Sequence, residues 1–214
     1  MRARISLAVL LMLAPATLRA EDWLLAAERA ARSAAIPGEN PPEKTPKARQ
    51  VFQPSSRFFI ADLPAEGWRP VEQEDSLGSV VRVFGPEDPT GLLRATLSIR
   101  LMDRDSPSFL PIKKAVDALR AGDASSDRSS TPVRPLRVPA GLARLFEIVE
   151  TRRLPVDAGP SAPLEIHHYV AVLPQGGESY FIIRLLSSRA NYLDFRNDFV
   201  EFLKSFRPLG AAGR

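Results

Sequence analysis

The sequence predicts an α+β fold in which a central antiparallel β-sheet carries helices on its faces. Patterns of short strands with tight connections recur along the chain, and two long helical patterns interrupt them, at residues 108–121 and 191–206. The strand expected at Ser179–Leu186 is apolar on both sides, so a layer should cover each face of the sheet. Its two apolar sides are Tyr180, Ile182 and Leu186, and Phe181, Ile183 and Leu185.

The first hairpin is expected at residues 77–101, after a short apolar strand at Phe58–Ile60. Its first strand is Leu77–Phe84. The second, Leu93–Leu101, has the clearest alternation of apolar and polar residues in the chain, which predicts a strand with one solvent-facing side. The connection between them is short and rich in turn residues, so the pair is antiparallel. The polar side of the second strand holds Arg94, Thr96, Ser98 and Arg100.

A helix and a second hairpin are expected in the middle of the chain. Residues 108–121 have apolar side chains at helical spacing, with Pro111 in the first turn, where proline is tolerated. Val133–Val138 is expected as an edge strand because prolines interrupt its hydrogen bonding. The remaining strands are Leu142–Thr151 and a hairpin made of Leu164–Leu173 and Ser179–Ser187.

An aromatic stripe marks the last helix, which Asn191 is expected to cap. Stripes of this kind are usually core rather than ligand sites, so the helix should lie across the sheet. The stripe consists of Tyr192, Phe195, Phe199, Phe202 and Phe206.

The first twenty residues have the layout of a secretory signal peptide. Met1–Arg4 is basic, Ile5–Leu13 is apolar, and Ala20 offers a small residue at a cleavage point. The apolar stretch is too short for a spanning helix, and no later segment is long enough. We therefore expect a periplasmic or secreted protein, cleaved near Ala20, with no transmembrane segment in the mature chain.

Charge and composition exclude several classes of function. The 214 residues include 29 basic and 25 acidic ones, but removal of residues 1–20 takes away three arginines and leaves a net charge of +1. The remaining basic residues are interleaved with acids, which argues against a nucleic-acid partner. The chain has no cysteine, so disulfides, thiolate metal sites and catalytic thiols are excluded.

Residues 21–56 are expected to be a short helix followed by a proline-rich linker. The helix, Asp22–Ala35, carries Trp23 on a face that is mostly alanine, so it buries little surface. Two interpretations stay open, a disordered N-terminus and a spacer that presents Trp23 for recognition. A single domain is expected at 57–208, with a tail at 209–214.

Two groups of residues resemble the PsbP-like superfamily. Phe59–Pro64 with Gly67–Trp68 is similar to the opening of these domains, and Tyr180–Ile183 followed by Tyr192, Phe199 and Ser205–Phe206 is similar to their end. The resemblance covers about residues 57–208 and implies an α/β/α sandwich around an antiparallel sheet. The superfamily includes bacterial envelope proteins of the DcrB type, and its members act mainly in binding or assembly. It carries over no catalytic residues.

Candidate chemistry is sparse. His167 and His168 are the only histidines, and adjacent residues on a strand point to opposite faces, so they cannot chelate one metal together. We expect one to face solvent and the other a helix interface. The chain has no G-x-S-x-G elbow, no G-x-G-x-x-G and no P-loop. No catalytic residue, metal or cofactor is predicted.

The arginines of the first hairpin are the candidate binding site, together with Trp23. Arg94 and Arg100 share the polar side of their strand, and Arg82 is expected across the hairpin. The alternative is a solvated sheet face with cross-strand charge pairs. Because arginines buried under a helix would be costly, either part of the sheet is uncovered or these residues line a cleft.

These features favour an exported, non-enzymatic binding or assembly module of the bacterial envelope, whose partner is another envelope or secreted protein. The alternatives are a carrier of a small or lipidic ligand and a small hydrolase with a dispersed site. A deep apolar pocket would favour the carrier. A serine or carboxylate pair within hydrogen-bonding reach of a histidine would favour the enzyme.

Overall fold

The structure, a computed structural model, describes residues 48–75, 78–106, 108–121, 127–154 and 162–209. All of them belong to one unit, Lys47–Arg214. The predicted signal peptide and Trp23 lie outside the described residues. In chain order the elements are β1 (Arg49–Phe52), β2 (Phe59–Pro64), β3 (Arg69–Asp75), β4 (Gly78–Glu87), β5 (Arg94–Met102), α2 (Ile112–Ala121), β6 (Arg128–Ser130), β7 (Arg134–Val138), β8 (Gly141–Leu154), β9 (Ala162–Gly176), β10 (Ser179–Ser188), α3 (Tyr192–Ser205) and β11 (Arg207–Pro208).

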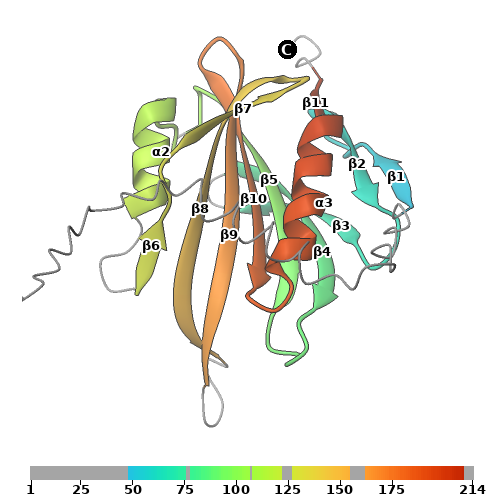
Figure 1. The fold of residues 1–214 in the computed structure, drawn as a ribbon. Helices are drawn as coiled ribbons and strands as arrows, with labels where there is room; N and C mark the ends of the chain where they lie inside the picture. Colours follow the sequence, from blue (N-terminus) through green and yellow to red (C-terminus); the bar gives the residue numbers. More distant parts are fainter. Residues whose placement is uncertain (1–47, 76–77, 107, 122–126, 155–161, 210–214) are drawn as a thin grey trace, which may run out of the picture. The chain divides into compact units, whose positions relative to one another are not determined.

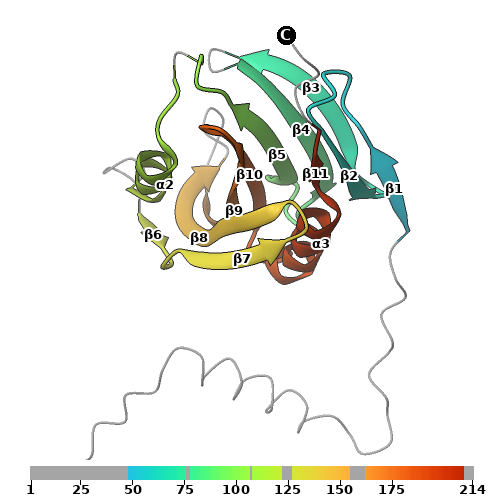
Figure 2. The ribbon, with the colours of Figure 1, turned by 90° about the horizontal axis from the view of Figure 1, so that it is seen from above.

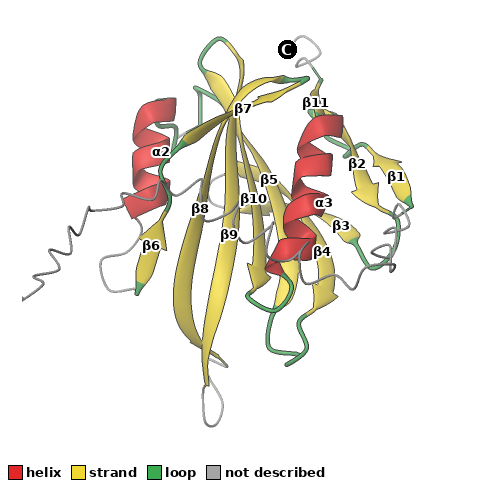
Figure 3. Ribbon diagram, viewed as in Figure 1, coloured by secondary structure: helices red, strands yellow, loops and turns green. Residues whose placement is uncertain are grey.

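Antiparallel strands make up most of the described unit, as the yellow arrows of Figure 3 show. The large sheet has the order β3-β4-β5-β10-β9-β8-β6, and β7 also pairs with β8. A small sheet has the order β1-β2-β11. Both predicted hairpins are confirmed, since β4 pairs with β5 and β9 with β10 (Figure 1).

The two helices pack on opposite faces of the large sheet. The larger core contains aromatic residues of α3, residues of the small sheet and one set of alternating strand residues. Phe181 and Ile183 of β10 belong to this set. Ala115 and Val116 of α2 pack with the other set, to which Tyr180 belongs. Figure 2 shows the curved sheet with α3 and α2 on its two sides. The predicted α+β class, with helices on the faces of an antiparallel sheet, is confirmed.

Four strands were not expected from the sequence, among them the short β6, which pairs with β8. β1 lies in the segment expected as linker, but it pairs with β2, and Phe52 lies 6.0 Å from Phe59 between ring centroids. β3 pairs with β4 along an edge that is rich in charge. β11 pairs with β2 directly after α3. All four are short or charged edge strands, and pairing with a neighbouring strand, more than their own residue pattern, makes them strands.

The helices differ from expectation in their details. α2 begins at Ile112 rather than Ser108, because Pro111 precedes it and supplies the carbonyl that accepts the Ala115 N–H. Asn191 is the N-cap residue of α3, as expected, but its side chain makes no capping hydrogen bond. Neither described helix is long and apolar enough to cross a membrane.

Candidate functional site

The candidate arginines lie on the face of the sheet that α2 partly covers. Arg82 of β4 is paired with Ser98 of β5, and Ser98 is paired with Arg184 of β10. Since cross-strand partners point to the same face, these three side chains form a row across neighbouring strands. Arg100 lies two residues along β5 from Ser98 and shares that face.

Arg82 and Arg100 share a single carboxylate, that of Asp75 at the end of β3. The Arg100 guanidinium donates hydrogen bonds from both Nη atoms to the two oxygens of Asp75, and Nη1 also donates to the Gly78 carbonyl over 3.2 Å. Nη2 of Arg82 lies 4.0 Å from Asp75 Oδ2, beyond hydrogen-bonding distance. The two guanidinium groups of Arg82 and Arg100 therefore place two positive charges beside the single negative charge of Asp75.

Arg94 lies apart from this pair, near the tip of the hairpin. It forms an ion pair with Glu87, its cross-strand partner, and both side chains are exposed. Pairs of this kind contribute little to stability. The geometry thus groups Arg82 with Arg100 and places Arg94 in a separate, charge-balanced contact.

The uncovered part of the sheet leaves the Arg82 side chain half-exposed, whereas the Arg100 side chain is only 14% exposed beside Asp75. α2 packs over β8, β9 and β10 through the core that contains Phe146 and Val170. No residue of β3 or β4 belongs to that core. Val71 of β3 is accordingly 39% exposed, and the Arg82 side chain is 42% exposed. Of the two expected possibilities, the structure shows the uncovered sheet.

A buried polar cluster on the same face was missed by the sequence analysis. His168 of β9 is fully buried, with Nε2 2.8 Å from Oε1 of Glu150 on β8. The Arg184 guanidinium of β10 donates to Nδ1 of His168, from Nε over 3.0 Å and from Nη2 over 2.8 Å. The three residues come from three neighbouring strands, and only the sheet register brings them together.

The hydrogen bonds determine the protonation of His168. Because a guanidinium has only donors, Nδ1 must accept with its lone pair, and the proton of the neutral ring is on Nε2, where it is donated to Glu150. Burial, and then the charge of Arg184, lowers the pKa of His168 to about 4. Burial raises the pKa of Glu150, but the His168 hydrogen bond and the nearby arginines outweigh it and lower the pKa overall.

Two further arginines surround this cluster. Nη2 of Arg152, two residues along β8, lies 2.8 Å from Oε1 of Glu150. Arg128 of β6 is the cross-strand partner of Glu150, and its Nη2 donates to the Leu119 carbonyl at the end of α2. Burial and the charges of Arg128 and Arg152 lower the pKa of Arg184, against the opposing charge of Glu150.

His167 points to the opposite face, as expected for neighbours on a strand. Its ring stacks on Tyr192 of α3 with centroids 4.2 Å apart, and its Nε2 lies 2.8 Å from Glu165 Oε1. Neither histidine faces solvent, so the expectation that one would do so is wrong: α3 covers one ring and neighbouring polar side chains enclose the other. In the described residues, neither imidazole has a serine hydroxyl within hydrogen-bonding distance, and no group of three or more His, Asp or Glu side chains could hold a metal ion.

Two open hollows are not lined by Arg82, Arg94 or Arg100. One of about 350 Å³ lies between the Ser55–Ser56 turn and β3, where Glu72 accepts hydrogen bonds from both serines. Burial raises the pKa of Glu72, but these bonds lower it overall. The other, of about 540 Å³, is formed at the β7–β8 turn by Arg137, Val138, Pro139, Gly141 and Leu142. Neither is a deep apolar pocket.

Comparison with known proteins finds matches among solved structures. No protein-family model matches the sequence, and no curated protein matches it significantly. A crystal structure from Bacteroides thetaiotaomicron matches 78% of this chain and half of its own chain, with 7% identity and a TM-score of 0.47. LpqN, involved in cell envelope biogenesis of Mycobacterium tuberculosis, matches 77% of this chain and 86% of its own, with 11% identity and a TM-score of 0.41. Cyanobacterial PsbP (CyanoP) from Synechocystis sp. PCC 6803 matches 81% of this chain and 100% of its own, with 13% identity and a TM-score of 0.39.

Proposed function

We propose that this protein is an exported, non-enzymatic binding module of the bacterial envelope, and that its partner presents carboxylates to the Arg82–Arg100 face. The face consists of Arg82, Arg100, Asp75 and the exposed Val71 on β3, β4 and β5. Export rests on the layout of residues 1–20.

The observation that carries the proposal is that two arginines share Asp75, while Arg82 stays accessible at the uncovered part of the sheet. Arg100 uses both of its terminal nitrogens on Asp75, whereas Arg82 donates no hydrogen bond to any described residue. A guanidinium has five N–H donors in a planar fork that suits a carboxylate. A carboxylate of a partner can therefore bind Arg82 without displacing the existing pair.

A binding role also fits the state of the two histidines. His168 is buried between Glu150 and Arg184, and His167 is held between Glu165 and Tyr192. Both rings are engaged in contacts within the protein, where they stabilise the fold. The exposed polar chemistry of this face is thus supplied by guanidinium groups, which favour recognition rather than proton transfer.

The test is site-specific crosslinking in the native envelope. A photo-crosslinking residue replaces Val71, and the captured partner is identified in the parent chain, in Arg82→Glu and in Arg189→Glu. Arg189 is the matched control because its side chain is 74% exposed and lies outside this face, next to Glu165. We expect a defined crosslinked partner in the parent and in Arg189→Glu, and loss of at least tenfold in Arg82→Glu.

The partner should in addition present acidic residues at the crosslinked position. Equal capture by all three chains would contradict a role for Arg82. A crosslinking residue at Leu193, outside the face, measures the background capture of bulk envelope protein. If the residue at Val71 captures only bulk protein at this background level, specific binding is contradicted.

A further inference from the structure

We propose that Arg128, Arg152 and Arg184 form a second site on the same face of the sheet, which binds the phosphate group of a small ligand. This Arg128–Arg152–Arg184 cluster goes beyond the proposed function, because it lies on β6, β8 and β10 rather than on β3, β4 and β5. Its floor is made by His168 and Glu150.

The charges of the cluster are unbalanced. Three guanidiniums surround one carboxylate, that of Glu150, and a neutral imidazole. Counted over these described side chains, two positive charges are in excess beside the end of α2. Since like charges held close together cost free energy in a partly buried site, a ligand with two negative charges would stabilise this arrangement. A phosphate monoester carries close to two negative charges at pH 7.

Hydrogen-bond donors are also in excess. Nε of Arg128 is buried and has no acceptor among the described residues, and the same holds for Nε of Arg120 in the last turn of α2. A buried donor without an acceptor costs about 1–3 kcal/mol, so such groups usually have a partner. Oxygen atoms of a phosphate can accept from several guanidiniums at once, and this geometry is the one that arginine recognises best.

The cluster is accessible from one side. His168 and Glu150 are buried, and Arg128 and Arg184 are half-buried above them. The Arg152 side chain is 56% exposed, and its guanidinium forms an ion pair with Glu150. The floor positions the arginines, and the exposed edge at Arg152 provides the approach for a ligand.

Calorimetric titration of the full chain with inorganic phosphate tests this site. Sodium chloride at matched ionic strength controls for screening. We expect saturable binding to the parent chain and a loss of affinity of at least tenfold in Arg152→Gln and Arg128→Gln. Arg189→Gln removes the same charge from an exposed position outside the cluster, so it should bind like the parent. Arg82→Gln should also bind like the parent, which separates this site from the Arg82–Arg100 face.

Glycerol phosphate, a soluble monoester, distinguishes the sources of the phosphate group. Binding of both probes would assign the site to a phosphate-bearing ligand, and binding of inorganic phosphate alone would assign it to the free anion. Absence of saturable binding of either probe would overturn the proposal. So would an equal loss in Arg152→Gln and Arg189→Gln, since net charge alone would then explain it. Circular dichroism of each variant confirms that it is folded.

Discussion

His168 donates a hydrogen bond from Nε2 to Oε1 of Glu150 over 2.8 Å, between adjacent strands of the sheet. Arg184 fixes this arrangement from the other side of the ring, because it occupies Nδ1 as a donor. The result is a neutral imidazole between a carboxylate and a guanidinium, which makes the centre of the sheet sensitive to changes in any one of the three groups.

The first prediction concerns Glu150, which is 3% exposed. Glu150→Gln keeps the shape and the hydrogen bond from His168 but leaves Arg152 and Arg184 without their carboxylate. Removing one partner of a buried ion pair should lower the free energy of unfolding by about 3 kcal/mol. Urea denaturation measures this change.

Glu178→Gln is its control. Glu178 pairs with Arg104 over 3.0 Å between exposed side chains, so its loss should cost below about 1 kcal/mol. If the two variants lose equal stability, the Glu150 contacts do not act as a buried network.

The second prediction concerns pH. The pKa of His168 is about 4 in the folded protein and about 6.5 in the unfolded chain, so the unfolded chain takes up a proton first as the pH falls. The contribution of His168 is therefore fully present above pH 6.5 and is lost between pH 6.5 and about 4. The loss should amount to about 3 kcal/mol.

Unfolding in urea at intervals between pH 7 and pH 4 measures this slope. His168→Gln should reduce the slope, since it removes the titrating group, and His167→Gln should keep it. Glu72 and Asp88, which do not contact His168, also have lowered pKa values, so they add a loss of stability at still lower pH in all three chains. An unchanged slope in His168→Gln would refute the assignment of this pH window to His168.

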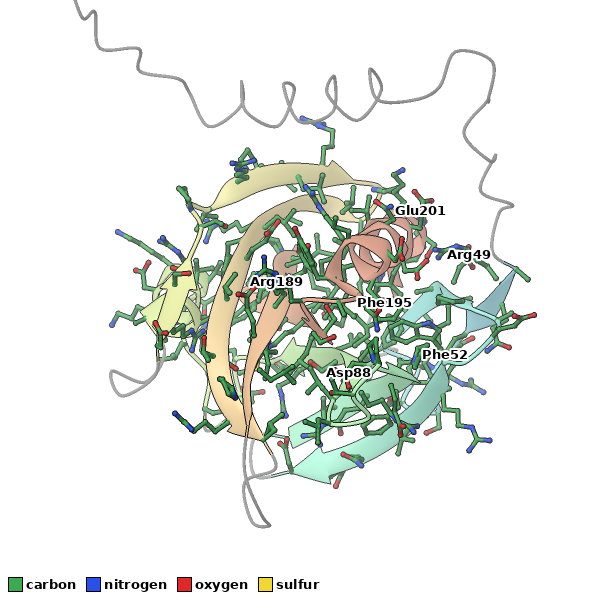
Figure 4. All side chains as sticks on the ribbon, turned by 60° about the horizontal axis from the view of Figure 1, so that its bottom comes forward. Arg49, Phe52, Asp88, Arg189, Phe195 and Glu201 are labelled. Atoms are coloured by element: carbon green, nitrogen blue, oxygen red, sulfur yellow. The ribbon has the colours of Figure 1, made fainter. Side chains whose placement is uncertain are left out.

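The third prediction concerns β1, which the sequence placed in a linker. Figure 4 labels two of its residues, Arg49 and Phe52. The Phe52 ring packs near Phe59, whereas the side chain of the preceding residue, Val51, is exposed. Phe52→Ala should lower the free energy of unfolding by about 1–3 kcal/mol, and Val51→Ala should leave it almost unchanged. Equal and small effects in thermal denaturation would show that β1 does not contribute to the stability of the fold.

The fourth prediction concerns the close approach of Gly85 to Trp68. A Cβ atom at Gly85 would lie 2.9 Å from the indole, and that ring packs edge-on against Phe195 of α3 with centroids 5.6 Å apart. Gly85→Ala should therefore displace Trp68 and cost about 1–3 kcal/mol. The same substitution in a Trp68→Leu background should cost much less, because the clash is gone. Additive effects in the double-mutant cycle would exclude this contact as the cause.

Much of the fold could be predicted from local patterns in the sequence. Alternation identified β5, the predicted second hairpin identified β9 and β10, and helical spacing of aromatic residues identified α3. The double-sided apolar character of β10 correctly implied a layer on each face. These patterns repeat every two to four residues, so they are visible without knowledge of which strands become neighbours.

Less of the polar chemistry could be predicted. Arg82, Arg94 and Arg100 could be grouped from the sequence because they lie on one short hairpin, and local spacing pairs residues only within that hairpin. Arg184 lies in an apolar run, where it stands out as a single charge, and this was the signal available for the missed cluster. The sequence offered no partner for it.

The sequence alone thus determined the class of fold, the main hairpins, the two helices and the opposite orientation of His167 and His168. The tertiary structure decided the rest: the pairing of β10 with β5, the edge strands β1, β3, β6 and β11, and the part of the sheet that α2 leaves uncovered. The physical reason is that side-chain periodicity is local, whereas register between distant strands is set by backbone hydrogen bonds and the packing of whole faces. That register brings Glu150, His168 and Arg184 into contact.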